Sequence, residues 1–525
     1  MRKTVKKLTA VGLTVTSVLG LVACGSSKGT TSQGTSENKE VTKPDTFTVM
    51  CDGTVVTETN GAEAFYKQLN EATGLDIKWT RPDHASYYDA VANAFNSDDT
   101  MPDVVLLSSD YYALYASNGF LWNMTDAWEH SETKNSGRLI STADNVLSAL
   151  MVNGEDGTKA MYGLSLYRGN GCCTYVKKAW LYKAGIDASK VKDVQMDFNT
   201  YYGYLKQMAQ TMGHYVISSP GFIHPEAPNT NYLPEFYQKA QYTFYKDTSG
   251  KYVDGFAQQE MKEALQRIQT AVNDGVIDKE SVNNSTSNAR DKFFSTDPST
   301  ETGVFSYWAG TWANTLKTNL SNKGLDDELI AIKPIKELGA YTERIAPCWC
   351  ITSAAKNPEG IFKYFIDKML DGGDVQMLWT HGAKGTHWDD KAETVTVEKK
   401  EDQPKTYTEG QFHYLPGIEK PDQWQTKNHI DPILSIANFT NGYVGESLIP
   451  EVARENGEFF AENSQVAVPL PMTSELSNNI GDINTARTYV IAQVALGYMT
   501  VDEGMDYYNK TVGSLSNAVL KSLNK

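Results

Sequence analysis

Apolar positions recur after residue 45 with two different periods. Segments in which apolar side chains alternate, as Phe47 and Val49 do, predict strands, whereas the spacing of Phe65, Leu69 and Ala72 predicts a helix. The run 102–107 is apolar without alternation, which is typical of a strand buried on both faces of a parallel sheet. The predicted strands are 46–50, 75–79 and 102–107, and the predicted helices are 62–72, 87–95 and 111–116. This βαβαβ order predicts an α/β fold.

Further elements are predicted later in the chain. Ser249 and Gly250 lie inside 242–252 and predict a hairpin there. Asn357, Pro358 and Glu359 suit an N-cap, a first helical position and an acidic first turn, so a helix is expected to begin there. Amphipathic helices are also predicted over 258–272, 485–499 and 501–523.

The N-terminus has the pattern of an export signal. Four positive side chains (Arg2, Lys3, Lys6 and Lys7) precede an uncharged run, 8–23, which is short for a bilayer span. The run ends in Leu21-Val22-Ala23-Cys24-Gly25, which resembles a bacterial lipobox. That resemblance implies a signal peptide over 1–23 and a lipid on Cys24. The alternative is an ordinary secretory signal in which Cys24 has no role.

A polar segment follows the signal. Residues 24–44 consist largely of Gly, Ser, Thr and charged residues without apolar periodicity, so they are expected to form a flexible tether. The predicted architecture is therefore a lipid, a tether and a large body outside the cytoplasmic membrane, with the lipid as its membrane attachment.

Composition and charge exclude several classes of protein. The chain has 525 residues, which suits two or three domains, and a formal net charge of −16. Such an acidic chain is not expected to bind nucleic acid or an anionic membrane surface. Five cysteines besides Cys24 cannot pair completely, and Cys348 and Cys350 are predicted as buried thiols on one face of a strand, although a strained Cys172–Cys173 disulfide remains an alternative.

Eight motifs occur in a set order along the chain. Glu71-Ala-Thr-Gly-Leu-Asp-Ile has the pattern E-x-T-G-I-x-V, and Pro102-Asp-Val-Val has the pattern P-D-V at the start of a strand. The other segments are Tyr115-Ala-Ser-Asn-Gly-Phe-Leu, Gly157-Thr-Lys-Ala-Met-Tyr-Gly-Leu-Ser, 175–186, 305–312, Ser353-Ala-Ala-Lys-Asn-Pro-Glu and Gly382-Ala-Lys-Gly-Thr-His-Trp. Together these motifs resemble those of the extracellular solute-binding proteins of ABC importers, in particular a sugar-importer lipoprotein branch. Ser165, Ala383 and Lys384 depart from the family pattern.

This resemblance implies a two-lobed, periplasmic-binding-protein-like α/β fold with hinge strands and a ligand cleft. The implied N-lobe comprises 45–165 and 340–385, and the implied C-lobe comprises 166–339 and 386–525. The second crossover is placed near 344–351. The resemblance also implies an ABC permease as partner, closure of the lobes around the ligand, and no catalysis. A monomer without a cofactor is expected.

A saccharide is the favoured ligand, because a sugar site needs flat aromatic platforms and fixed polar groups. The candidates follow strand ends or lie at the implied crossovers, where ligands of open α/β sheets bind. They are Asp52, Ser109, Asp110, Tyr111, Tyr167, Arg168, Trp308, Trp312, Trp349 and Trp388. Each has a structural alternative: Trp308 can serve the core, Asp110 can cap a helix, and Arg168 can pair with a structural carboxylate.

Other functions remain open at this point. The same fold could bind a peptide or another polar solute, for which Arg81, Arg168 and Asp110 would suit a zwitterion. A secreted carbohydrate-active enzyme is a weaker alternative, since the hydrolase, metalloprotease and P-loop motifs are missing from the sequence. No metal site is predicted: His381 and His387 are expected to be solvated turn residues, and 247–254 matches a calcium loop poorly.

Overall fold

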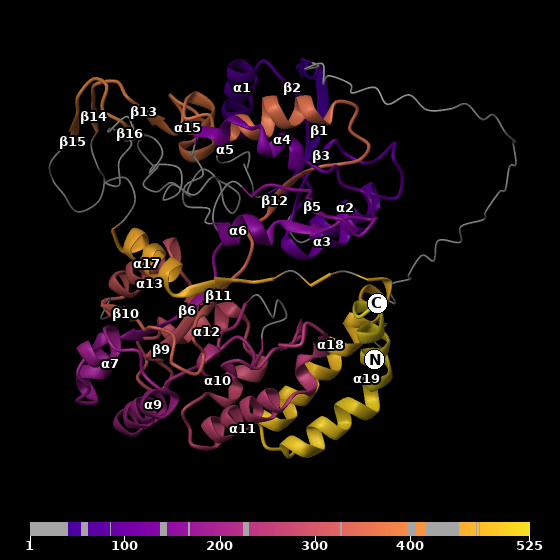
Figure 1. Ribbon diagram of the computed structural model, residues 1–525. Helices are drawn as coiled ribbons and strands as arrows, with labels where there is room; N and C mark the ends of the chain where they lie inside the picture. The colour runs from indigo at the N-terminus through magenta and orange to yellow at the C-terminus, as the bar shows by residue number, and fades with distance from the viewer. Residues whose placement is uncertain are drawn as a thin grey trace, which may run out of the picture. The chain divides into compact units, whose positions relative to one another are not determined.

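The computed structural model in Figure 1 describes residues 40–525 with gaps. The residues outside the description are 1–39, 54–60, 84–85, 137–143, 166–168, 224–229, 326–327, 396–404, 416–450, 469 and 472. The predicted signal peptide, Cys24 and most of the predicted tether therefore lie outside the described residues. Within the described part, no helix has both the length and the hydropathy needed to span a membrane.

The first sheet is built from the predicted βαβαβ unit. Its strand order is β12-β3-β1-β2, in which β1 (Thr46–Met50), β2 (Asp76–Thr80) and β3 (Val104–Leu107) are parallel. Helices α1 (Ala62–Thr73), α2 (Tyr87–Ala94) and α3 (Ser109–Ser117) follow these strands. Strand β12 (Cys348–Ile351) joins the edge of β3 in antiparallel orientation. The predicted strands and helices of this region are thus confirmed to within two residues at most ends.

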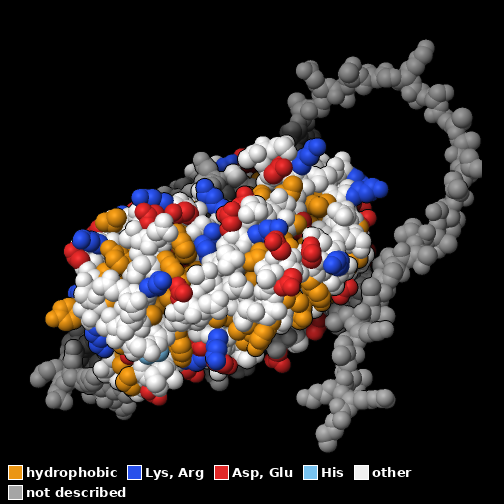
Figure 2. Space-filling view, turned by 90° about the horizontal axis from the view of Figure 1, so that it is seen from below, with side chains coloured by type: hydrophobic (Ala, Val, Ile, Leu, Met, Phe, Trp, Pro, Cys, Tyr) orange, Lys and Arg blue, Asp and Glu red, His pale blue; other side chains and the backbone are white. Residues whose placement is uncertain are grey.

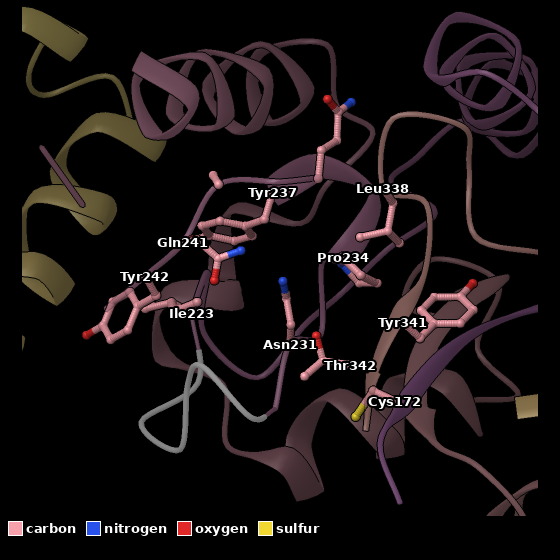
Figure 3. A pocket seen from close by; sticks show the side chains of 12 residues that line it. Cys172, Ile223, Asn231, Pro234, Tyr237, Gln241, Tyr242, Leu338, Tyr341 and Thr342 are labelled. Atoms are coloured by element: carbon pink, nitrogen blue, oxygen red, sulfur yellow. The ribbon is translucent and has the colours of Figure 1, made fainter. Parts of the chain in front are cut away.

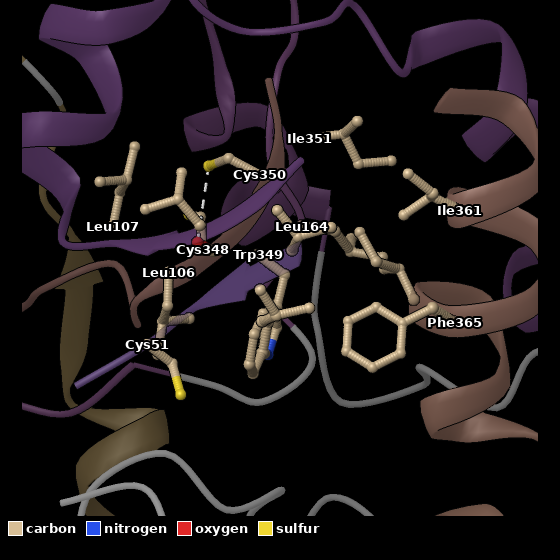
Figure 4. Packing of buried hydrophobic residues seen from close by; sticks show 14 of the residues in the cluster. Cys51, Leu106, Leu107, Leu164, Cys348, Trp349, Cys350, Ile351, Ile361 and Phe365 are labelled. Carbon is tan, nitrogen blue, oxygen red and sulfur yellow. Dashed lines mark hydrogen bonds between the residues drawn. The ribbon is translucent and has the colours of Figure 1, made fainter. Parts of the chain in front are cut away.

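A hydrophobic core covers this sheet and defines the first lobe. Trp349 on β12 contacts the ring of Phe365 (Figure 4) and also that of Trp379, and the two rings come from two helical segments after the strand. The predicted helix start is confirmed, since the Asn357 side chain accepts a hydrogen bond from Gly360 N. The remaining elements of this lobe are α4 (Thr125–Glu129), α5 (Glu132–Ser136), α6 (Asp144–Ala149), β4 (Met151–Asn153), β5 (Lys159–Met161), α14 (Pro358–Ile361), η5 (Phe362–Ile366), η6 (Asp367–Leu370) and α15 (Asp374–His381).

The second lobe has its own antiparallel sheet, in the order β10-β6-β9. The strands are β6 (Cys172–Lys177), β9 (Val304–Trp308) and β10 (Leu329–Ala331). The predicted hairpin is confirmed as β7 (Phe244–Lys246) and β8 (Tyr252–Asp254). The helices are α7 (Lys178–Lys183), α8 (Ser189–Lys192), α9 (Phe198–Met212), α10 (Pro234–Tyr237), η3 (Gly255–Ala257), α11 (Gln259–Asn273), η4 (Lys279–Asn283), α12 (Thr286–Phe293), α13 (Thr311–Asn322), α17 (Glu451–Glu462), α18 (Ser474–Ala495) and α19 (Val501–Leu523).

One of these helices begins earlier than predicted. The prediction started the first C-terminal helix at residue 485, whereas α18 begins at Ser474 and is capped by the Thr473 side chain, which accepts a hydrogen bond from Leu476 N. The extra turns contain Asn478, Asn479 and Gly481, which are poor helix formers. Packing of α18 against α11 and α19 outweighs this weak local preference.

A buried ion pair fastens both C-terminal helices to the hairpin. Arg487 on α18 is fully buried and donates from Nη2 to Asp254 Oδ1 of β8 at 2.8 Å. The other carboxylate oxygen, Oδ2, accepts hydrogen bonds from Tyr508 Oη at 2.7 Å and Ser516 Oγ at 2.6 Å, both on α19. One carboxylate therefore holds three elements together.

The chain passes between the two cores at several places. Leu164 forms a β-bridge with Trp349, and Arg344 N donates to Asn170 O at 3.1 Å, so the first two crossovers run side by side. A further contact was not predicted: β17 (Ser464–Val466) pairs in parallel with β11 (Tyr341–Glu343), and Val466 packs against the first lobe's core.

The segment after residue 385 differs from its predicted place in the second lobe. Strands β13 (Trp388–Asp389), β14 (Glu393–Val395), β15 (Lys405–Tyr407) and β16 (His413–Tyr414) form two small sheets. Trp388 Nε1 donates to Gly382 O at 2.8 Å, and His381 Nδ1 lies 2.7 Å from Tyr414 Oη. These contacts attach the strands to α15 of the first lobe, because the turn after α15 folds Trp388 back over its own helix.

Candidate functional site

On the first lobe, polar and aromatic groups gather at the carboxyl ends of β1 and β3. Asp52 follows β1 and is 8% exposed. Tyr88 on α2 and Tyr111 on α3 stack face to face, with ring centroids 3.8 Å apart and planes 6° apart. Ser108 N donates to Tyr88 Oη at 2.8 Å, which fixes this stack to the end of β3. Together these groups offer one carboxylate beside a pair of parallel rings.

The hydroxyl of Tyr88 stays neutral in this environment. Burial is the main reason that the pKa of Tyr88 is raised; hydrogen bonding with Ser108 opposes the rise, and the nearby Tyr111 and the carboxylate of Asp52 add to it. Tyr88 was not predicted as a site residue, because its spacing with Val91 and Phe95 fits an apolar helix face. Tyr88 is the second residue of α2, which follows the carboxyl end of β2. The rule that ligands bind beyond the carboxyl ends of strands would therefore have indicated it.

Four of the predicted residues cannot be placed at the level of their side chains. Ser109 and Asp110 form the first turn of α3, directly after β3, and their side chains lie outside the description. Tyr167 and Arg168 fall in the gap 166–168 and so lie outside the described residues.

On the second lobe, Trp308 and Trp312 flank the carboxyl end of β9. Trp308 is the last residue of β9 and is half-buried, with the guanidinium of Arg344 4.5 Å from its ring centroid. Trp312 lies in the first turn of α13 and is 36% exposed. Gly310 between them has φ 66°, a left-handed conformation that glycine adopts without strain and that turns the chain from strand to helix.

Two buried tyrosines, Tyr307 and Tyr232, lie in a row with Trp312. Tyr307 meets Trp312 edge to face at 5.2 Å, and Tyr232 stacks on Tyr307 at 6.2 Å. Arg290 donates from Nη1 to Tyr307 Oη at 3.1 Å, and its guanidinium carbon lies 5.8 Å from the Trp312 ring centroid. The second lobe thus carries a row of three rings with a cation above its exposed end.

A cavity of about 70 Å³ lies beside this row, in the second lobe (Figure 3). Its wall includes Cys172, which pairs with Trp308 across β6 and β9, and Asn231, which precedes Tyr232. The amides of Asn231 and Gln241 point into the same space in Figure 3. Gln238, also in the wall, has φ 54°, which is unfavourable for a residue with a side chain. Backbone strain of this kind often accompanies functional sites.

Two predicted tryptophans belong to the protein interior instead. Trp349 is 1% exposed and packs against Phe365 (Figure 4) and Trp379, so its indole ring belongs to the core. Trp388 is 7% exposed and stacks on Phe412 at 5.1 Å. Each ring packs on other aromatic rings, Trp349 in the core of the first lobe and Trp388 against the β13–β16 strands, and burial of such a large apolar surface is favourable.

The histidine and cysteine predictions have different outcomes. His381 and His387 are buried, so their prediction as solvated turn residues is wrong, and His387 Nδ1 accepts a hydrogen bond from Ala383 N at 2.7 Å. Cys348 and Cys350 are buried thiols on β12, as predicted, and Cys172 and Cys173 are also unpaired with each other. Among the described residues, no group of three His, Cys, Asp or Glu side chains could hold a metal ion.

No protein-family model matches the sequence, and no curated protein matches it at a significant level. Solved structures do match. The N-glycan transport solute-binding protein NgtS from Streptococcus pneumoniae aligns with a TM-score of 0.58 at 18% identity, over 91% of this chain and 98% of that chain. The alginate-binding protein AlgQ2 without calcium ion aligns with a TM-score of 0.57 at 15% identity, over 93% and 99%.

A maltose-bound structure shares the same architecture. It is MalE3 of T. maritima, which aligns with a TM-score of 0.54 at 14% identity, over 90% of this chain and 100% of that chain. At these identities the likeness concerns the fold. The predicted two-lobed, periplasmic-binding-protein-like α/β fold is therefore confirmed, and the similar proteins named here are binding proteins rather than enzymes.

Proposed function

We propose that this protein is a lipid-anchored receptor that captures a saccharide, in particular an oligosaccharide, outside the cell and delivers it to an ABC permease. The observation that carries the proposal is a pair of aromatic groups at strand ends: Tyr88–Tyr111 on one lobe, and the partly exposed Trp312, supported by the buried Tyr307, on the other. The fold supports it, because the fold is shared by an N-glycan transport solute-binding protein, an alginate-binding protein and a maltose-bound MalE3.

The two surfaces suit the chemistry of sugars. Exposed ring faces such as Trp312 can pack against the C–H faces of a pyranose, and the carboxylate of Asp52 can accept hydrogen bonds from sugar hydroxyls. Sugar hydroxyls that lost water without gaining a partner would weaken binding, so fixed polar groups are needed beside the rings. The binding role needs no catalytic step.

The mechanism is closure of the two lobes on the ligand. A saccharide held by both surfaces would bind the closed arrangement more tightly than the open one, and this difference in affinity would shift the population towards closure. The permease would then recognise the closed form. The paired crossovers at Leu164–Trp349 and at β11–β17 are the segments that would bend.

The predicted anchor can be tested separately from ligand binding. Replacing Cys24 by serine should remove the acceptor of the lipid, so the protein should move from the membrane fraction to the culture medium. Fractionation and metabolic labelling with palmitate would measure this change. Label retained on the Cys24→Ser protein would contradict lipidation at Cys24.

Trp312 should contribute directly to affinity. Trp312→Ala removes a partly exposed ring that the fold does not bury, so we expect about tenfold weaker saccharide binding and an unchanged melting temperature. Calorimetric titration would measure the affinity. Tyr182→Ala is the control, because Tyr182 is another exposed aromatic (85%) on a different helix, α7. Equal affinities of the two variants would remove Trp312 from the site.

The proposal itself is tested by a thermal-shift screen of the full chain against monosaccharides, oligosaccharides, amino acids and peptides. A ligand that binds the folded state raises the melting temperature by mass action. We expect a shift with one class of oligosaccharide and no change in that sugar on long incubation. A shift with peptides alone would replace the ligand class, and consumption of the sugar would make the protein an enzyme.

A further inference from the structure

Two arginines, Arg290 on α12 and Arg344 at the second crossover, differ from three others in their electrostatic partners. Arg267, Arg454 and Arg487 each lie within 4.0 Å of a carboxylate oxygen, from Glu263, Glu458 and Asp254 respectively. Arg290 and Arg344 form no ion pair within the described ranges of the chain.

Both of these guanidiniums are held in place by an aromatic ring instead. Arg344 lies 4.5 Å from the centroid of Trp308, and Arg290 lies 5.8 Å from that of Trp312. Arg290 is also oriented by its hydrogen bond to Tyr307 Oη. A guanidinium has five N–H donors in a planar fork, and stacking on a ring leaves the edge of that fork available to an acceptor.

The two Arg–Trp pairs lie at the same strand end. Trp308 and Trp312 are four residues apart, which places their Cα atoms within about 14 Å of each other. Asn170 ties the pairs together, because its carbonyl accepts from Arg344 N at 3.1 Å and its Nδ2 donates to Ala309 O at 3.0 Å. Both cations therefore belong to the surface on which the proposed ligand binds.

The local backbone adds to the positive potential. Helix α13, of 12 residues, begins at this turn, and its N-cap Gly310 supplies no side chain to satisfy the first N–H groups. Elsewhere the charges are mixed: on the face in Figure 2, acidic and basic side chains are interspersed. The positive potential at the end of β9 thus comes from Arg290, from Arg344 and from the N-terminus of α13.

We propose that the captured saccharide is acidic, carrying uronic-acid carboxylates that pair with Arg290 and Arg344 while its rings pack on Trp312 and Trp308. A carboxylate can accept two parallel N–H···O hydrogen bonds from one guanidinium. A neutral hydroxyl has a single oxygen and cannot accept this two-oxygen pairing. This inference rests on the proposed function, since it names the class of sugar that the same surface binds.

The test compares sugars that differ only at C6. The full-length chain is titrated calorimetrically with trisaccharides of galacturonic, glucuronic and mannuronic acid and with their neutral counterparts, at low and at high NaCl. We expect one uronate to bind at least tenfold more tightly than its neutral counterpart, and salt to reduce this preference. The third arm is a trisaccharide that carries sulfate esters in place of carboxylates. It should bind more weakly than the uronate.

Charge-removing variants then locate the effect. Arg290→Gln and Arg344→Gln should each weaken binding of the uronate by tenfold or more while binding of the neutral sugar changes less than twofold. Lys246→Gln is the matched control, because Lys246 also lies over a ring, that of Tyr252 at 5.1 Å, but on the β7–β8 hairpin. Unchanged melting temperatures of the three variants would establish that the fold is intact.

The outcomes separate the two proposals. Tightest binding of a neutral or sulfated sugar, or uronate affinity that neither arginine variant changes, would overturn the acidic-sugar proposal and leave the proposed receptor function intact. Failure of every saccharide to bind would count against the receptor function itself.

Discussion

Replacing Arg487 by leucine should lower the free energy of unfolding of the second lobe by about 3–5 kcal/mol. The substitution leaves the Asp254 carboxylate buried, with hydrogen bonds from Tyr508 and Ser516 but without its cation. It also removes the guanidinium from among the rings of Tyr242 and Phe244, at 5.4 and 5.0 Å. Urea denaturation followed by circular dichroism would measure the loss.

Two further variants show whether the charge causes the effect. The double variant Arg487→Leu with Asp254→Asn removes the unpaired charge and should recover part of the lost stability. Arg454→Leu breaks the half-exposed pair with Glu458 on α17 and should cost less than about 1 kcal/mol. A loss for Arg487→Leu as small as that for Arg454→Leu would show that the buried pair does not fasten α18 and α19.

The stability of the second lobe should also depend on pH through Glu235. This side chain is buried in α10, next to the cavity wall, and desolvation raises its pKa from 4.5 to about 7. Its Oε1 accepts hydrogen bonds from Thr174 Oγ1 at 2.8 Å and Tyr341 Oη at 3.3 Å, which oppose the rise without cancelling it. No cation contributes to this shift; Cys173 and Tyr201 are the other titratable groups that its charge affects.

The direction follows from the raised pKa. The folded state binds this proton more tightly than the unfolded chain, so the stabilisation is complete below about pH 4.5 and is lost as the pH rises through 7. The difference of about 2.5 pKa units corresponds to about 3 kcal/mol. Glu235→Gln keeps the size of the side chain and an oxygen that can accept hydrogen bonds, but it cannot gain or lose a proton in this pH range.

Urea denaturation between pH 5 and pH 8.5 would measure this dependence. The stability of the wild type relative to Glu235→Gln should fall as the pH rises, and the exposed Glu260→Gln on α11 should follow the wild type. Parallel pH profiles for the wild type and Glu235→Gln would contradict the assignment of this proton to Glu235.

Local patterns in the sequence predicted the first lobe well. The alternation around Phe47 and the spacing of Phe65 and Leu69 depend on which face of one element is buried, which is a local property. The position of β13–β16 depends instead on contacts between Trp388, Gly382 and Tyr414, and no period in the sequence encodes such contacts. The same holds for the pairing of β17 with β11.

The site was predicted less completely for a related reason. Trp312 was predicted at a turn after a strand and Trp349 at the second implied crossover, yet Trp312 is partly exposed and Trp349 is enclosed by Phe365 and Trp379. Exposure of an aromatic ring is decided by what packs on it from distant segments. Arg290 was missed because its neighbour in space, Trp312, is 22 positions away in the sequence.

The position of β12 at the edge of the first sheet also sets an order of events during folding. β12 comes from residues 348–351, after the strands of the second lobe's sheet, and it covers the open edge of β3. Until those residues emerge, β3 is an apolar strand with an unpaired edge, and such edges promote aggregation. The edge of the first lobe therefore needs protection until about two thirds of the polypeptide, through residue 351 of 525, has been made.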